Sequence, residues 1–204
     1  MTKRQNKLRG SYRNIVRLPI TPQNYQDGNK FYPDAYMIAY SIGEIAGSKE
    51  GRKAMVGAGI LSALSPQVDW GQNVEWAILL AKTRTRKQTI VQHNKAIAIL
   101  DGAEPLDVLG ERAWKTIAFY KAILKPNHAD EPVVDRHALS VYMGREGTEK
   151  ERKLLNNPYL FTKIQKAYMR ASKELDMNVH ILQASTWLQW RENKGIISRQ
   201  YTDD

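Results

Sequence analysis

Apolar residues recur along most of the chain at intervals of three and four, the spacing that places side chains on one face of an α-helix. The segment 160–175 shows this pattern most clearly. No stretch of useful length alternates apolar and polar residues, and no hairpin dipeptide lies between β-branched runs. The pattern therefore predicts an all-α fold of about eight helices with short connections.

Helix ends are indicated by capping residues and by prolines. Asp34 is a candidate N-cap for a helix over 35–47, because its carboxylate can accept hydrogen bonds from free backbone N–H groups. A helix over 52–64 ends at Ser65, since Pro66 disfavours helical conformation in the residue before it.

The first 33 residues differ from the rest. Residues 1–17 carry six Lys or Arg and no acid, and blocks of like charge are usually mobile. Pro19, Pro22 and Pro33 are predicted to keep the following segment extended or turning. The arm is interpreted either as a contact to phosphates or as a solvated tail. The predicted organisation is a basic N-terminal arm over 1–33, a two-lobed helical domain over 34–195 and a tail over 196–204.

The charge balance favours a polyanionic partner. The 204-residue chain has 31 Lys and Arg against 21 Asp and Glu, which gives a net charge of +10 and a pI near 9.7. Phosphates are the obvious counter-charge, so DNA, single- or double-stranded, is the expected partner. A merely basic protein without such a partner is the alternative.

Composition excludes several classes of site. Cysteine is absent, which rules out disulfides, cysteine-ligated iron–sulfur or zinc sites and a thiol nucleophile. The histidines show no metal-ligand spacing, so neither a metal nor another cofactor is expected. No apolar run approaches the roughly 18 residues that span a bilayer, and no apolar segment follows the basic N-terminus as in a signal peptide. We expect a cytoplasmic monomer without a membrane segment.

Two residues suited to catalysis lie in the segment 109–138. Lys115 is near the start of one predicted helix, and Asp135 is the predicted N-cap of the next. A helix–loop–helix return can bring both to one cleft. An amine that acts as a nucleophile and a carboxylate that stabilises positive charge form a catalytic pair. A surface lysine and a plain capping aspartate are the alternative interpretation.

Two segments resemble the helix-hairpin-helix (endonuclease III-like) DNA glycosylase superfamily, in particular its phage-encoded branch. The segment 64–67, which ends in Gln67, and Asn73 beyond it resemble the family's DNA-facing loop and the start of the next helix. The segment 109–115 matches the first leucine and the lysine of the family's hairpin. The segment 134–137, Val-Asp-Arg-His, resembles the motif that holds the catalytic aspartate.

The resemblance implies two α-helical lobes with a cleft between them and excision of a flipped base from DNA. It implies Asp135 as the catalytic carboxylate, Lys115 as the nucleophile of a lyase step, and Gln67 as a candidate to fill the gap left by the base. Glu111 and Ala113 depart from the family, because they replace hairpin glycines whose N–H groups would hold a phosphate. A glutamate there would repel that phosphate.

Further side chains are candidates for contacting DNA. Trp70 and Trp114 can stack on a base, although core packing is the alternative. His137 is interpreted as structural. On the last helix, Gln183, Trp187 and Arg191 are interpreted as core and solvated edge, with a place in the lining of the cleft as the alternative. The basic candidates are Arg112 and Arg136 beside the catalytic pair, and the cluster Lys82, Arg84, Arg86 and Lys87.

Three functions remain open at this point. The first is a DNA N-glycosylase, with or without lyase activity, acting on a damaged or modified base. The second is a phage base-hypermodification enzyme on the same fold, acting on a substituted pyrimidine base or nucleotide, which the altered hairpin favours. The third is a non-catalytic DNA-binding module. Placement of Lys115 and Asp135 in one open cleft would favour the first two.

Overall fold

The computed structural model describes residues 9–126 and 131–196, and every regular element in these ranges is a helix. The all-α prediction is confirmed. The α-helices are α1 (Tyr12–Val16), α2 (Pro22–Ile45), α3 (Lys53–Leu64), α4 (Trp70–Thr83), α5 (Ile90–Leu100), α6 (Pro105–Leu109), α7 (Trp114–Leu124), α8 (Arg136–Met143), α9 (Glu149–Lys153), α10 (Pro158–Glu174) and α11 (Val179–Asn193), and 3₁₀ turns span Glu50–Arg52 and Leu154–Asn156. The described ranges thus hold eleven α-helices rather than about eight, because α1, α6 and α9, of five residues each, are too short to show a helical period.

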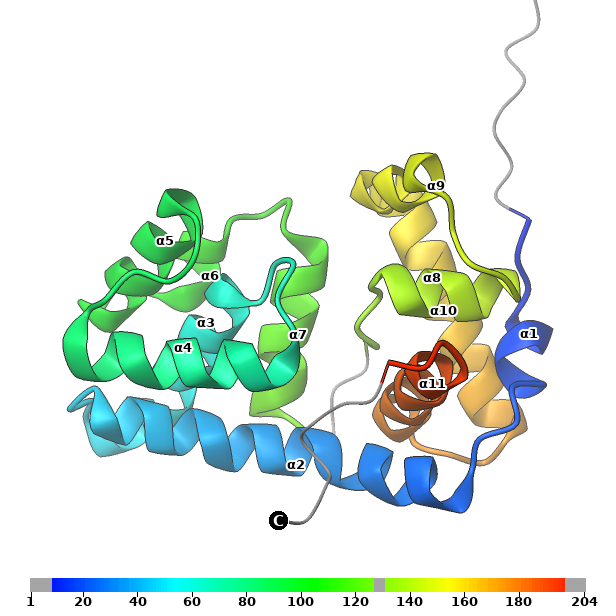
Figure 1. Cartoon of the computed structure of the whole chain (residues 1–204), viewed down its shortest axis with the longest axis horizontal. Helices are drawn as coiled ribbons and strands as arrows, with labels where there is room; N and C mark the ends of the chain where they lie inside the picture. The colour runs from blue at the N-terminus through cyan, green and yellow to red at the C-terminus, as the bar shows by residue number, and fades with distance from the viewer. Residues whose placement is uncertain (1–8, 127–130, 197–204) are drawn as a thin grey trace, which may run out of the picture.

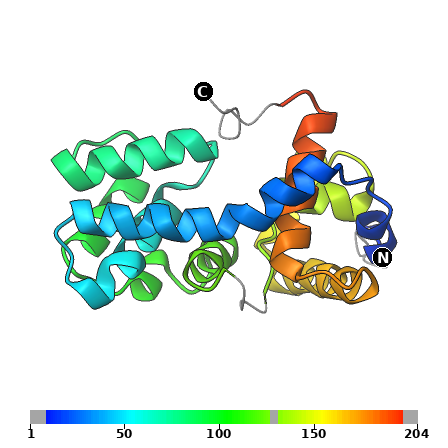
Figure 2. The ribbon, with the colours of Figure 1, turned by 90° about the horizontal axis from the view of Figure 1, so that it is seen from below.

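The helices form two lobes that share α2 (Figure 1). One lobe, called here the α3–α7 lobe, packs on the C-terminal half of α2. The other, called the α8–α11 lobe, also contains α1 and packs on the N-terminal half. Seen from below, α2 runs as one continuous helix beneath both lobes (Figure 2). The long helix therefore fixes where the lobes face each other.

Helix α3 is the centre of its lobe. Every residue from Val56 to Leu64 is buried, and a helix that is apolar all round belongs in a core. It packs against α2, α4, α5 and α7. Gly57 lets α3 approach α2 closely, because a Cβ atom there would overlap the backbone carbonyl oxygen of Ala39.

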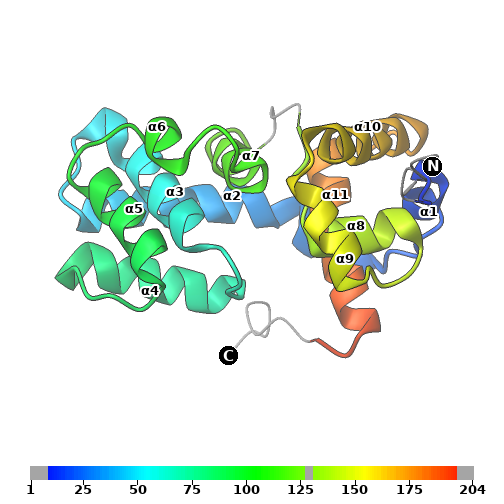
Figure 3. The same cartoon turned by 90° about the horizontal axis from the view of Figure 1, so that it is seen from above.

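The α8–α11 lobe has its own core, in which α10 packs against α1, α8 and α11 (Figure 3). Tyr168 of α10 is fully buried, and its hydroxyl lies 3.2 Å from that of Thr186 on α11. Gly28 of α2 contacts Ser185 of α11 so closely that a Cβ atom would overlap it. Both lobes are thus clamped onto α2 through small residues.

The segment predicted as an extended arm is largely helical. Residues 1–8 lie outside the described residues, but α1 begins at Tyr12 and buries Ile15. Pro22 occupies the first turn of α2, where its missing N–H is not needed. Pro33 lies inside α2 and removes one hydrogen bond, which costs about 3 kcal/mol. The helix continues because Phe31, Tyr32 and other residues around this proline are buried.

This continuation corrects two further expectations. Asp34 is an exposed residue inside α2 and not an N-cap. The helical domain begins well before residue 34, since the N-cap of α2 is Thr21, whose side chain accepts a hydrogen bond from Asn24 N. The predicted tail over 196–204 lies outside the described residues except for residue 196.

Candidate active site

A pocket of about 290 Å³ lies between the lobes, and Phe31 and Tyr32 from α2 line it. The α3–α7 lobe contributes the loop before α4, the start of α4 and the start of α7. The α8–α11 lobe contributes the segment that leads into α8 and one face of α11. The pocket therefore exists only when both lobes are assembled on α2.

The pocket brings together residues that are far apart in the chain. Both members of the predicted catalytic pair, Lys115 and Asp135, line it. Four of the predicted DNA-contacting residues line it as well. They are Gln67, Trp70, Asn73 and Arg136.

Asp135 is held by the backbone of the helix that it caps. It is the N-cap of α8, as predicted, and its Oδ1 accepts hydrogen bonds from His137 N at 2.9 Å and Ala138 N at 2.8 Å. The preceding residues Val133 and Val134 are buried, which anchors the approach to the cap. Its Oδ2 accepts no hydrogen bond from any described residue. One carboxylate oxygen is therefore fixed, and the other is available to the pocket.

Lys115 is the second residue of α7 and is exposed. Within residues 9–126 and 131–196, neither Lys115 nor Asp135 has an ion-pair partner within 4.0 Å. Helix α6, a turn over 110–113 and α7 stand where the resemblance implies a hairpin, and Gly110 supplies the positive φ of 89° that the turn needs. Glu111 on this turn is exposed.

The loop 65–69 carries Gln67 in an unusual conformation. Gln67 is exposed and has a φ of 62°, which few residues other than glycine adopt. The loop is tied down by Gln88, whose Nε2 donates to Leu64 O at 3.2 Å and Pro66 O at 3.0 Å. Such strain at a pocket is a reason to suspect a functional residue.

Asn73 has a positioning role in the structure. It is buried, and its Nδ2 donates to Leu61 O at 3.0 Å, which fastens α4 to α3. Its Oδ1 is buried and finds no partner among the described residues. The side chain therefore fixes the pocket wall, and a direct contact to DNA remains a prediction.

Aromatic rings form one wall of the pocket. Phe31 on α2 lies at the centre, with ring centroids 5.4 Å from Trp70 and 5.6 Å from Trp187, and Trp70 is 5.9 Å from Phe119. Trp70 begins α4 and is only 8% exposed. It therefore packs in the core and also lines the pocket, and its stacking on a base stays a prediction.

Gln183 is oriented by a buried tyrosine. The hydroxyl of Tyr32 donates to Gln183 Oε1 at 2.7 Å. Burial, and to a lesser degree the charge of Asp135, raise the pKa of Tyr32 well above its ordinary value, so the phenol stays protonated and remains a donor. This bond leaves the Gln183 amide nitrogen, which donates to no described residue, as a donor for the pocket.

Positive groups surround Asp135 in the pocket. Burial lowers the pKa of His137 below its ordinary value. The charge of Asp135 opposes this shift, and those of Arg136, Arg191 and Lys115 reinforce it. Burial likewise lowers the pKa of Arg191. His137 is therefore neutral at pH 7, and the charged groups are one lysine and two arginines facing Asp135 and Asp69.

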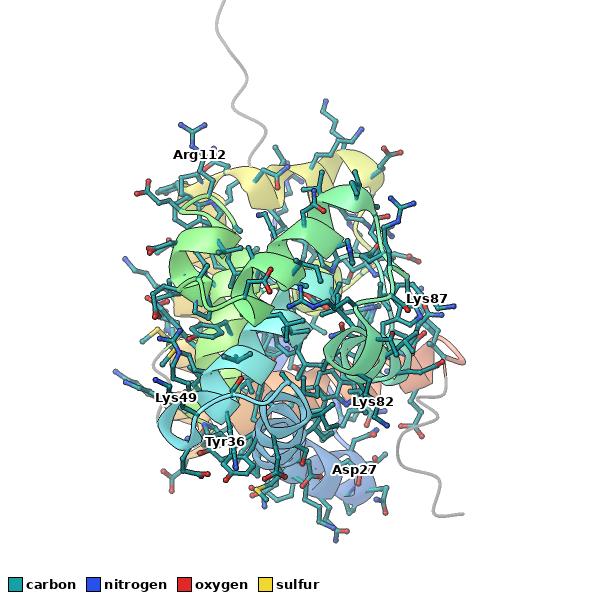
Figure 4. All side chains as sticks on the ribbon, turned by 90° about the vertical axis from the view of Figure 1, so that its left-hand side faces the viewer. Asp27, Tyr36, Lys49, Lys82, Lys87 and Arg112 are labelled. Atoms are coloured by element: carbon teal, nitrogen blue, oxygen red, sulfur yellow. The ribbon has the colours of Figure 1, made fainter. Side chains whose placement is uncertain are left out.

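The remaining predicted contacts lie away from the pocket. Trp114 is partly buried against the core, which accounts for it without a bound base. Arg112 is exposed on the turn before α7, at the upper edge of the molecule in Figure 4. The basic cluster lies at and beyond the C-terminal end of α4. Lys82 and Lys87 project from one side of the molecule (Figure 4), and Arg86 is also exposed. Arg84 forms an ion pair with Asp101. These side chains do not line the pocket.

Sequence reasoning underrated the last helix. Gln183, Trp187 and Arg191 recur every four residues on α11 and all line the pocket. The polar and charged members of this stripe were the available signal, since a purely structural face would be apolar. Phe31 and Tyr32 were missed because the segment that contains them was assigned to an arm.

Comparison with known proteins identifies a family. The model for the family of unknown function DUF7178 matches residues 2–194, so the chain belongs to that family. No curated protein and no solved structure matches it. The described residues contain no group of three or more His, Asp or Glu that could hold a metal ion. None of the helices described is at once long enough and apolar enough to cross a membrane.

Proposed function

We propose that this DUF7178 protein is a DNA N-glycosylase that cleaves the bond between a sugar and a base held in the pocket between its lobes. The observation that carries the proposal is the meeting of Asp135 and Lys115, without ion-pair partners among the described residues, in a pocket with an aromatic wall. The resemblance in the segments 60–77 and 109–138 supports the same activity.

Asp135 acts on the sugar. When the bond from C1′ to the base nitrogen breaks, the electron pair leaves with the base and the sugar becomes an oxocarbenium-like cation. A carboxylate with one oxygen fixed by backbone N–H groups presents its negative charge without needing to reorganise. The same carboxylate can orient the water that attacks C1′. Lys115 is the candidate nucleophile for a lyase step, in which its amine replaces that water.

The aromatic wall of the pocket and Gln183 bind the base. Trp70, Phe31 and Trp187 offer ring faces and edges against which a base removed from the stack can pack. The Gln183 amide nitrogen, held in place through Tyr32, can donate to a carbonyl oxygen of the base. A pyrimidine or purine ring fits the volume of the pocket.

One observation favours a second candidate function. Glu111 is exposed on the turn before α7, where a phosphate of duplex DNA would approach in a helix-hairpin-helix protein. A negative charge there weakens such a grip. A base-hypermodification enzyme that acts on a substituted pyrimidine base or nucleotide would not need this turn to bind a phosphate of duplex DNA.

The test is the variant Asp135→Asn. Asparagine caps helices as well as aspartate does, so the fold of α8 is expected to be kept while the charge is lost. Release of bases from DNA with modified pyrimidines, measured by mass spectrometry, should fall at least about a hundredfold. Asp34→Asn, which removes an exposed carboxylate from α2, is the matched control and should stay within about twofold of wild type.

Two results would count against the proposal. Base release by Asp135→Asn within a few-fold of wild type would remove Asp135 from the mechanism. If the wild-type protein binds DNA but releases no base, the non-catalytic DNA-binding function would take precedence.

A further inference from the structure

Three cationic side chains from three different helices converge on the pocket. Lys115 comes from α7, Arg136 from α8 and Arg191 from α11. In the part of the chain that the structure describes, none of them has a carboxylate within 4.0 Å.

Of the three side chains, Arg191 is the one that is partly buried, whereas Lys115 and Arg136 are exposed. Its guanidinium lies 4.8 Å from the centre of the Trp187 ring, and its Nε is buried without a partner among the described residues. Burial lowers the pKa of Arg191. The charge of Asp69 and, less strongly, that of Asp135 oppose this shift, and the charge of Arg136 adds to it. A guanidinium that is partly removed from water, next to another cation and lacking a hydrogen bond, is an incomplete arrangement that an anion would complete.

The acidic groups of the pocket do not supply that anion. Asp69 caps α4 through a bond from Gln72 N at 3.0 Å, and Asp135 caps α8. One oxygen of each carboxylate accepts from the helix that it caps, and both carboxylates lie more than 4.0 Å from the nitrogens of the three cations. The described lining also contains one more cation than carboxylates, because His137 is neutral at pH 7.

We propose that Arg136 and Arg191 form a phosphate-binding subsite at the rim of the pocket, which holds a phosphate attached to the nucleoside whose base lies against the aromatic wall. This inference rests on the proposed function, since it takes the bound group to be a nucleoside. Arginine is suited to the role because its planar fork can donate two hydrogen bonds to one phosphate. The substrate class is therefore a nucleotide, either free or within a strand, and not a free base or nucleoside.

The experiment compares each of the four deoxynucleosides with its 5′-monophosphate, using quenching of tryptophan fluorescence to measure Kd at low salt. At least one monophosphate should bind about tenfold or more tightly than its nucleoside. Arg191→Gln and Arg136→Gln should each reduce the ratio of the nucleoside Kd to the monophosphate Kd toward one, and should leave the affinity for the nucleoside unchanged. Arg136 is exposed, so its replacement keeps the test valid if loss of the Arg191–Trp187 contact disturbs folding.

Two further variants serve as controls. Arg191→Lys should keep part of the advantage of the monophosphate, because the positive charge remains. Lys163→Gln removes an exposed charge of α10 that does not line the pocket, and should leave both affinities unchanged. The source of the phosphate is distinguished by a single-stranded oligonucleotide of five residues. Tighter binding of the oligonucleotide than of the monophosphate, lost in the same variants, identifies a strand phosphate; equal binding identifies a free nucleotide.

The subsite is overturned if every nucleoside binds as tightly as its monophosphate, or if neither arginine variant changes the ratio. In that case the proposed function survives, because base release by the wild-type protein and its loss in Asp135→Asn are measured separately. If no nucleoside and no monophosphate binds, the subsite is overturned together with the use of this pocket for a nucleoside.

Discussion

At the scale of the residue, the pocket depends on how two aspartates are held. Asp69 and Asp135 both cap helices, and each accepts from backbone N–H groups of the helix that follows. Backbone donors orient a carboxylate without cancelling its charge as a neighbouring arginine would. A reacting carboxylate benefits from this arrangement, because it is positioned and still negative.

His137 yields a prediction about pH. Burial lowers its pKa in the folded protein, and the three cations of the pocket add to this effect against Asp135. Below pH about 6.5 the unfolded chain therefore binds a proton that the folded protein resists. The stability contributed by neutral His137 is complete above that pH and is lost as the pH falls through the lowered pKa, by at most about 1.4 kcal/mol per pH unit.

The measurement is the free energy of unfolding in urea between pH 5 and 8 for the wild-type protein and for His137→Gln. The wild-type protein should lose stability relative to the variant as the pH falls below about 6.5. A difference that stays constant across this range, or an imidazole NMR signal of His137 that titrates at or above the ordinary value, would contradict the prediction.

The residues that sequence reasoning found and missed differ in one physical respect. The place of Asp135 and Lys115 in one pocket was predictable from the sequence. Each stands at the start of a helix, where local sequence determines both the cap and the direction of the side chain. The place of Arg191 and Gln183 in the pocket could not be predicted in this way, because only the packing of α11 against α2 decides which face of α11 meets the pocket. Trp70 and Trp114 were both predicted to contact a base because both are tryptophans near a predicted helix start. Only the tertiary structure shows that Trp70 lines the pocket and that Trp114 does not.

At the scale of the element, close helix contacts depend on glycine. We predict that Gly57→Ala lowers the free energy of unfolding by about 2 kcal/mol or more, because its Cβ would overlap the Ala39 carbonyl oxygen on α2. Urea denaturation measures the change. Gly51→Ala is the matched control, since a Cβ there meets nothing within 4 Å, and it should not destabilise. Equal effects of the two substitutions would show that α2 and α3 can separate at little cost.

The helices themselves were largely predictable, with one instructive exception. The period of three and four residues marked α10, and Gly144 marked the end of α8. The start of α2 was placed too late, because Pro33 was interpreted as a barrier to helix. The free energy gained by burying Phe31 and Tyr32 in the tertiary structure outweighs the local cost of the proline. Rules based on local sequence do not include the free energy of tertiary burial.

At the scale of the whole molecule, the net charge of +10 is spread over separate regions. The basic cluster at the end of α4, Arg112 and the pocket cations lie on different parts of the surface, as Figure 4 shows for Lys82, Lys87 and Arg112. Under the proposed function, the basic groups outside the pocket are candidates for contacting the phosphates of DNA on either side of the bound nucleotide.

The contribution of the N-terminus can be measured by replacing Lys3, Arg4 and Lys7 with glutamine. If these residues contact phosphates, the slope of log affinity for duplex DNA against log salt should become shallower by up to about 2.7. Replacement is preferable to deletion of residues 1–17, because Ser11 N donates to Tyr142 O at 3.0 Å and Ile15 is buried. An unchanged slope would show that the first eight residues do not contact DNA.

The path of the chain through the two lobes determines the order in which the protein can form during synthesis. The α3–α7 lobe is encoded without interruption, so it and the half of α2 that it covers can fold once residue 124 has left the ribosome. Helix α1 and the first turns of α2 must wait for α8, α10 and α11, which are made later. Because α11 also brings Gln183, Trp187 and Arg191, the nascent protein has no complete pocket until α11 has been made. A chain that is cut short before α11 would therefore be half-folded, with an uncovered stretch of α2 as a target for chaperones and proteases.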